Sequence, residues 1–131
     1  EWMTNLRAHK TENVVKAIPP QTVHGDPQAD LLVVSWGSGF GPVRTAVDRA
    51  QANGLSVAHL SLRHLNPFPA NLGDLLKGAK KILVAETNLG QLNWLLRARY
   101  LIEAATLCKV QGKPLNASDV YSGIEETLGR G

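Results

Sequence analysis

A glycine-rich segment after a run of aliphatic residues is the first place where this sequence could bind a ligand. Gly37, Gly39 and Gly41 follow the apolar run Leu31–Ser35, and a strand, a glycine loop and a helix in this order cradle phosphate groups in many α/β proteins. The spacing G-x-G-x-G differs from the dinucleotide fingerprint G-x-G-x-x-G, whose third glycine would stand at Pro42. Glycines here also permit a tight turn and a close approach of helix to sheet, and we favour that structural interpretation.

A second loop leaves a nucleotide-binding alternative open. Arg63 and His64 follow the second expected strand, where dinucleotide-binding proteins usually carry a carboxylate for the ribose. An arginine at this place could instead contact a 2′-phosphate. Binding of a phosphorylated dinucleotide by Gly37–Gly41 and Arg63 is therefore the alternative function, of a phosphate- or dinucleotide-binding Rossmann-like module.

Other catalytic signatures are missing from the sequence. Ser38 lacks the G-x-S-x-G context of a hydrolase nucleophile, and Glu125-Glu126 lies on a segment with a surface pattern. We expect His59, inside a strand, to be a hydrogen-bonded core or edge residue rather than a ligand, and Cys108 to be buried and unreactive. No metal-ligand spacing relates the cysteine to the four histidines, which are His9, His24, His59 and His64. We therefore predict neither catalytic residues nor a metal site.

Three loops would instead meet at one edge of the sheet, and we call their candidate residues the loop rim. Exposed aromatic groups beside hydrogen-bonding ones are typical of an interface or a ligand-binding edge. The alternative is ordinary packing of one loop on another. The loop rim consists of Trp36, Gly37, Ser38, Gly39, Phe40, Gly41, Arg63, His64, Asn66, Phe68, Glu86, Asn88 and Gln91.

The elements that must position these residues alternate between strands and helices. Strands are expected at 31–35, 56–62, 81–86 and 106–111, and helices from Pro42 to Asn53-Gly54 and at 71–78, 91–104 and 117–128. This order predicts right-handed crossovers and a three-layer α/β/α fold with a mostly parallel sheet of four to five strands. One antiparallel edge strand is possible at Thr22-Val23-His24. Residues 1–20 are expected to form an N-terminal helix or connecting arm, and residues 21–131 the domain.

Composition limits what a chain of 131 residues with 14 Lys+Arg, 11 Asp+Glu and one cysteine can be. It predicts a single globular domain without an internal disulfide or a self-contained four-cysteine metal site. No aliphatic run is long enough to span a membrane. Neither an initiator Met nor a signal pattern is present, so we expect an excised or processed piece. The lysines at 77, 80 and 81 indicate a solvated face rather than a nucleic-acid site.

Three stretches give the chain a recognisable pattern: LLVVSWGSGFGPV (31–43), AHLSLRHLNPFPANL (58–72) and ILVAETNLGQL (82–92). Together they resemble the C-terminal domain of the alpha subunit of 2-oxoacid:ferredoxin oxidoreductases, above all of the 2-oxoglutarate type. That domain is similar to the C-terminal domain of transketolase. The resemblance extends from about residue 3 to residue 121.

The resemblance implies a thiamine-diphosphate enzyme complex. The family converts a 2-oxoacid and coenzyme A to acyl-CoA and CO2, and passes electrons through iron–sulfur clusters to ferredoxin. Thiamine diphosphate and Mg would be held by a beta subunit and by the pyrimidine-side domain that precedes this one. A second alpha subunit and a cytoplasmic location are also implied, with neither nucleic acid nor membrane as a partner.

This stretch of the family carries none of its catalytic motifs. We therefore predict a non-catalytic scaffold and interface domain that binds no cofactor by itself. A further alternative is that the loop rim receives coenzyme A in the intact complex, through Arg63 and His64.

Overall fold

Four parallel strands form the centre of the structure, which is a computed structural model that describes residues 19–37, 40–63, 68–86, 91–108 and 115–129. The strands are β1 (Leu31–Trp36), β2 (Val57–Leu62), β3 (Ile82–Glu86) and β4 (Ala105–Cys108). They lie in the order β2-β1-β3-β4. Because every pair is parallel, all four carboxyl ends meet at one edge.

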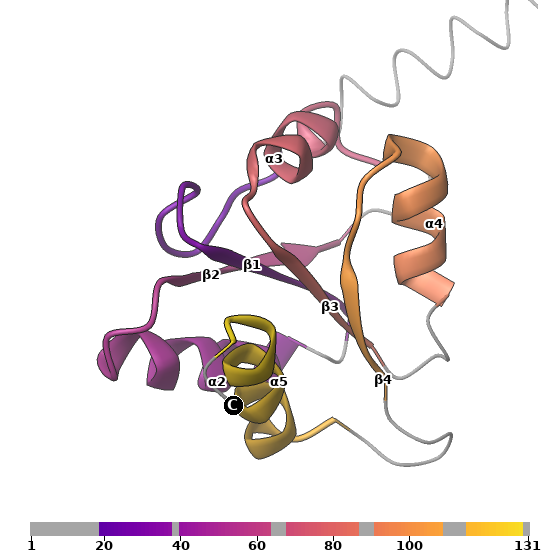
Figure 1. Ribbon diagram of the computed structural model, residues 1–131. Coiled ribbons are helices and arrows are strands. Elements are labelled where there is room, and N and C mark those ends of the chain that lie inside the picture. The colour runs from indigo at the N-terminus through magenta and orange to yellow at the C-terminus, as the bar shows by residue number, and fades with distance from the viewer. Residues whose placement is uncertain (1–18, 38–39, 64–67, 87–90, 109–114, 130–131) are drawn as a thin grey trace, which may run out of the picture.

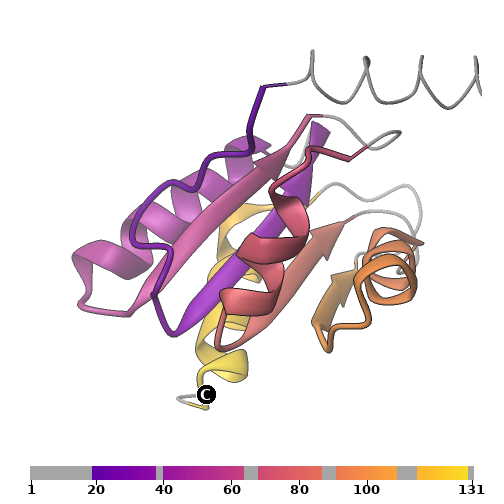
Figure 2. The same ribbon diagram turned by 90° about the horizontal axis from the view of Figure 1, so that it is seen from above.

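Helices cover both faces of this sheet (Figure 1). The helices α2 (Phe40–Ala52) and α5 (Ala117–Thr127) pack on one face, and α3 (Leu72–Gly78) and α4 (Gln91–Tyr100) on the other. Figure 2 shows the sheet between these two layers. The prediction of a three-layer α/β/α fold with a parallel sheet is confirmed, with four strands among the described residues.

Two apolar cores explain why the strands read as nearly continuous aliphatic runs. Successive side chains of a strand point to opposite faces, so Leu31 and Val33 of β1 enter the core under α2 and α5. Leu32 and Val34 enter the core under α3 and α4. A strand buried on both faces cannot alternate with polar residues. The buried side of α2 consists of Val43, Ala46, Val47 and Ala50, whose spacing is that of one helix face.

Two helix boundaries differ most from the sequence prediction, and the others agree to within one or two residues. The helix α2 begins at Phe40 rather than at Pro42; the proline is tolerated in the first turn because amides there have no partner within the helix. The helix α4 ends at Tyr100 rather than near residue 104. Leu101 adopts a left-handed φ of 55°, which stops the helix and turns the chain toward β4.

The segment before β1 meets the sheet at one residue. His24 forms an isolated antiparallel bridge with His59 of β2, so the possible edge strand at 22–24 is reduced to a single bridge. The predicted helix within 1–18 lies outside the described residues, as do residues 109–111 of the fourth expected strand. In the described part of the chain, no helix has the length and hydropathy required to cross a bilayer.

Asn93 ties α4 to the strand that follows it. Its buried side-chain amide donates to the backbone oxygens of Ala104 and Ala105, at 3.0 and 3.2 Å, and to the Thr106 hydroxyl. These bonds hold the start of β4 against the first turn of α4, which is why a polar residue occupies a helix position that faces the core.

Replacing Asn93 by alanine should destabilise the fold. Asn93→Ala removes the donor shared by these acceptors, and we expect the free energy of unfolding in urea to fall by about 1–3 kcal/mol. The matched control is Asn53→Ala, which loses an exposed hydrogen bond of 2.8 Å to the Tyr121 hydroxyl. That control should change stability by no more than about 0.5 kcal/mol. Equal losses in the two variants would contradict this role of Asn93.

Candidate functional site

The carboxyl edge of the sheet contains the place where ligands usually bind in open α/β proteins. The chain leaves β1 toward β2 on one side and reaches β3 on the other, so the crevice between β1 and β3 is the topological switch point. The helix α2 follows β1 on one face of the sheet, and α4 follows β3 on the other. Their N-terminal ends therefore flank the crevice.

Glu86 occupies the anion-binding position of one of these helices. Its carboxylate oxygens accept hydrogen bonds from the backbone amides of Leu92 and Asn93, at 2.8 and 3.0 Å. The side chain is only 8% exposed. A negative charge at a helix N-terminus is favourable because it pairs with the free amides and with the positive end of the helix dipole. The Glu86 carboxylate was predicted as a hydrogen-bonding group of an exposed edge, whereas the structure buries it as the cap of α4.

A buried polar chain links the other side of the crevice to β2. The His59 ring is 1% exposed and lies with its Nε2 at 2.7 Å from the Ser35 hydroxyl. The Arg44 Nε donates to His59 Nδ1 at 3.1 Å. An arginine only donates, so Nδ1 must accept, and the ring proton is placed on Nε2 toward Ser35. The expectation that His59 is a hydrogen-bonded core residue is confirmed.

This environment keeps the His59 ring neutral. Burial lowers its pKa from 6.5 to about 4, and the Arg44 guanidinium adds to the effect, as does His24, whereas the Asp48 carboxylate opposes it. A second proton on Nδ1 would also break the bond from Arg44. The imidazole therefore holds Ser35 and Arg44 in place and does not serve as a proton carrier at neutral pH.

Arg44 joins the buried chain to an exposed aromatic residue. Its guanidinium lies 4.6 Å from the centre of the Phe40 ring, which is itself 5.6 Å from the His59 ring. Phe40 and Trp36 are 39% and 45% exposed. The crevice is thus flanked by aromatic surface and by an arginine whose position is fixed by contacts with two residues, Phe40 and His59.

Gly37 of the loop rim fits a turn rather than a close approach to a neighbouring element. Gly37 has a φ of +62°, which favours glycine, and a Cβ built at Gly37 or Gly41 meets no described atom within 4 Å. Gly41 lies inside α2. The predicted role in a tight turn is confirmed at Gly37, and close packing of helix on sheet at these two positions is not seen.

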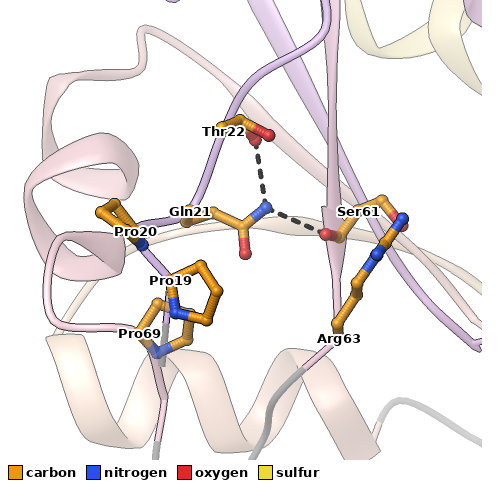
Figure 3. A pocket seen from close by; sticks show the side chains of 7 residues that line it. All are labelled: Pro19, Pro20, Gln21, Thr22, Ser61, Arg63 and Pro69. Carbon is orange, nitrogen blue, oxygen red and sulfur yellow. Dashed lines mark hydrogen bonds between the residues drawn. The ribbon is translucent and has the colours of Figure 1, made fainter. Parts of the chain in front are cut away.

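Arg63 lines a cavity of about 330 Å³ at the end of β2 (Figure 3). Gln21 lies across it and donates from its side-chain amide to the backbone oxygens of Thr22 and Ser61, at 3.0 and 2.9 Å. The side chain of Asn71 holds the same segment: it accepts a hydrogen bond from the backbone N–H of Gln21 and donates one to the backbone carbonyl of Gln21. The remaining walls are prolines: Pro19, Pro20 and Pro69. Among the described residues that line this cavity, Arg63 alone carries a charge.

The other residues of the loop rim differ in exposure. Gln91 is exposed at the first position of α4. Phe68 is half-buried against the core beneath α3 and α4, with its ring 5.7 Å from that of Tyr100. Cys108 lies in the fourth strand, as predicted, and is the last residue of β4, but the burial of its side chain lies outside what the structure describes. The loop-rim positions outside the described residues are Ser38, Gly39, His64, Asn66 and Asn88.

Sequence reasoning did not single out Ser35, Arg44 and Asn93. One signal was available, because Ser35 and His59 are polar residues inside two otherwise apolar strands, and buried polar groups need partners. The described part of the chain contains no group of three or more His, Cys, Asp or Glu residues arranged to hold a metal ion.

Acid should destabilise the protein through His59. The folded pKa of about 4 lies below the usual 6.5, so the unfolded chain binds the proton first as the pH falls. The contribution of His59 is complete above pH 6.5 and is lost as the pH falls toward 4, by about 3 kcal/mol in all. His59→Gln, which does not titrate, should show a correspondingly flatter decline of unfolding free energy over this interval.

The control for this prediction is His24→Gln, since His24 is half-exposed and pairs with Asp48 at 2.8 Å. That variant should keep the steep decline of the unchanged protein. An NMR titration in which the His59 ring protonates near pH 6.5 would contradict the assignment.

Comparison with known proteins places the chain among oxidoreductase subunits. A family model described as pyruvate:ferredoxin oxidoreductase core domain II matches residues 29–117. The 2-oxoglutarate oxidoreductase subunit KorA of Mycobacterium tuberculosis is 41% identical over 129 residues, which are 98% of this chain and 19% of that protein. The alpha subunit of 2-oxoacid:ferredoxin oxidoreductase 2 of Aeropyrum pernix is 32% identical, over 100% of this chain and 21% of that protein. The chain thus spans about a fifth of the length of these relatives.

Solved structures agree with this placement. A chain of the 2-oxoglutarate:ferredoxin oxidoreductase of Magnetococcus marinus matches with a TM-score of 0.88 and 29% identity, over 97% of this chain and 23% of that one. A split-gene transketolase matches with a TM-score of 0.65 and 20% identity, over 86% of this chain and 43% of that one, and so shows a shared fold. The predicted resemblance to these alpha subunits and to the transketolase C-terminal fold is confirmed, and the chain belongs to the pyruvate:ferredoxin oxidoreductase core domain II family.

Proposed function

We propose that the chain is a non-catalytic scaffold and interface domain of a 2-oxoglutarate:ferredoxin oxidoreductase alpha subunit, and that its loop rim packs against neighbouring domains. In this proposal residues 21–131 form the domain, and residues 1–20 are the arm that connects it to a preceding pyrimidine-side domain. The other partners are a beta subunit, a second alpha subunit and, through the whole complex, ferredoxin. The location of the complex is the cytoplasm.

The cap formed by Glu86 is the observation that carries this proposal. An anionic ligand at the switch point would need free helix amides, but at α4 two of them, Leu92 and Asn93, already donate to this carboxylate. A phosphate brought to the same amides would meet a fixed negative charge. On the α4 side, the crevice therefore favours a protein surface over a ligand that carries a phosphate group.

The other side of the crevice has the composition of an interaction surface. Trp36 and Phe40 expose apolar area, and Arg44 is held beside Phe40 by the His59 ring. Tryptophan, other aromatic residues and arginine are enriched where protein–protein interfaces bind most tightly. An arginine fixed in advance loses less conformational freedom when it binds.

The relatives support the chemistry that we propose for the complex. The solved oxidoreductase of Magnetococcus marinus holds 2-oxoglutarate, coenzyme A and succinyl-CoA. We assign the same reaction to the complex of this chain, with ferredoxin as the electron acceptor. Thiamine diphosphate, Mg and the iron–sulfur cluster would be bound by other domains. Within the chain, the buried His59 and Glu86 are committed to hydrogen bonds that hold α2 and α4, which supports a role without catalysis.

Removing the exposed tryptophan should weaken assembly without unfolding the domain. Trp36→Ser deletes a side chain at the last residue of β1 that is 45% exposed, so the 131-residue chain should still fold, with a modestly lower melting temperature. In the full-length subunit, we expect the dissociation constant for the beta subunit to rise by about tenfold or more, or about 1.4 kcal/mol, because a central interface aromatic is lost. Analytical ultracentrifugation of the purified subunits measures this constant.

Two further variants calibrate this experiment. Arg49→Ser alters an exposed position of α2, outside the loop rim, and should leave the dissociation constant unchanged. Phe68→Asp should weaken assembly and also lower the melting temperature, because Phe68 packs against Tyr100. Unchanged assembly in Trp36→Ser would reject the loop rim as an interface.

A further inference from the structure

The outer face of α4 carries an apolar stripe that nothing in the described structure covers. Trp94 is 71% exposed, Leu95 37% and Leu101 89%. Trp94 and Ala98 are spaced i and i+4, so they share one side of the helix, and Leu101 follows directly after its last residue. Leu101 still belongs to this last turn because its amide donates to the Arg97 carbonyl at 2.8 Å. We call Trp94, Leu95, Ala98 and Leu101 the α4 stripe.

Leu101 is unfavourable in two independent ways. Its φ of 55° is in the left-handed region, where helix ends normally carry glycine or asparagine because a branched side chain is strained there. Its side chain is also 89% exposed. Both the backbone strain and the exposure of Leu101 are explained if its side chain becomes buried when the chain binds a partner.

The stripe lies apart from Trp36 and Phe40, whereas Gln91 of the loop rim begins the same helix. Leu92 and Leu96 of α4 face the core, whereas Trp94 and Leu95 face away from it. The helix stands beside β4, the edge strand opposite β2 (Figure 2). The Arg44–Phe40 pair lies at α2, on the other face of the sheet. A partner on the stripe would therefore approach from a different direction than a partner on Trp36 and Phe40.

The charges around the stripe define the partner. The helix carries Arg97 and Arg99 and no acidic residue. Within the described residues neither arginine forms an ion pair, and Arg99 lies 5.2 Å from the centre of the Tyr100 ring. The surface that fits this face combines an apolar groove with Asp or Glu carboxylates at its edge.

A second copy of the chain would not supply carboxylates to Arg97 through the same helix face. A two-fold axis through the stripe would pass near its midpoint, which falls between Arg97 and Ala98. An isologous interface brings the same patch of both copies together. Arg97 would then face Arg97 of the other copy, with no carboxylate on either helix to compensate.

We propose that the α4 stripe is a second docking surface, and that its occupant is an apolar, carboxylate-edged segment of another domain of the assembled oxidoreductase. This inference rests on the proposed function in one respect, namely that the chain acts inside a longer subunit. Its relatives support that, since the chain spans 19% and 21% of their lengths. The docking of α4 itself rests on exposure, strain and charge that do not involve the loop rim.

Hydroxyl-radical footprinting with residue-level mass spectrometry tests the burial of the stripe. The free 131-residue chain and the assembled complex are oxidised under the same conditions. Oxidation of Trp94 and Leu101 should be high in the free chain and should fall in the complex to the level of Leu96, which is 0% exposed in the chain itself. If both residues react in the complex as strongly as in the free chain, the proposal is overturned.

Carbodiimide cross-linking tests the chemistry of the occupant. Arg97→Lys keeps the positive charge and supplies an amine that condenses with a nearby carboxylate to form an amide. In the complex we expect a cross-link from position 97 to an Asp or Glu outside residues 1–131. Arg49→Lys, at an exposed position of α2 on the other face of the sheet, is the matched control and should not give this product. Cross-links from position 97 confined to residues 1–131 would overturn the proposal.

Two other occupants would be recognised by different results. Binding of the free chain to phosphatidylserine vesicles that is lost in Trp94→Ser would replace the proposed occupant by a lipid surface. Dimerisation of the free chain that is lost in the same variant would replace it by a second copy. The same footprinting experiment also measures the oxidation of Trp36. If Trp36 is protected in the complex and Trp94 is not, only the α4 docking surface is rejected. If Trp94 is protected and Trp36 is not, only the loop rim is rejected as an interface.

Discussion

The pairing of the Glu86 carboxylate with the first amides of α4 is the interaction on which the carboxyl edge of the sheet depends. It joins the carboxyl end of β3 to the helix that follows, at the point where α/β proteins usually bind anions. Asn93 extends the connection from the same turn of α4 to the start of β4. The cost is the loss of an anion site, since a phosphate at these amides would be repelled. In the proposed function, a fold that resembles nucleotide-binding proteins instead packs against other domains of the complex.

A neutral histidine plays the equivalent role on the other face of the sheet. His59 accepts from Arg44 and contacts the Ser35 hydroxyl, and its low pKa means that this arrangement persists at physiological pH. Glu86 and His59 have side chains that catalytic sites often use, but each is buried with its hydrogen-bonding capacity committed to protein. The exposed groups at the carboxyl edge and on α4 are mainly aromatic, aliphatic and cationic, namely Trp36, Phe40, Trp94, Leu101 and Arg97.

The sequence predicted the layers of the fold because burial on both faces leaves a strong mark. Leu31–Ser35 and the stripe of α2 needed no tertiary information. The end of α4 was placed too late because the apolar pattern continues through Leu101 and Ile102, while a left-handed backbone leaves no mark in the pattern. For the candidate site, Trp36 and Phe40 were expected to be exposed and are. Glu86 caps a helix and Arg44 binds His59 because different elements come close together in the fold. The local sequence pattern carries no information about such distances.

The claim that this domain assembles an enzyme without performing its chemistry has a direct test. The purified 131-residue chain is supplied with 2-oxoglutarate, coenzyme A, thiamine diphosphate and Mg, and the reduction of a viologen dye is followed in the absence of oxygen. The account predicts no reduction above the rate without protein, whereas the complete complex under the same conditions reduces the dye. Sustained reduction that requires both 2-oxoglutarate and the isolated chain would contradict it.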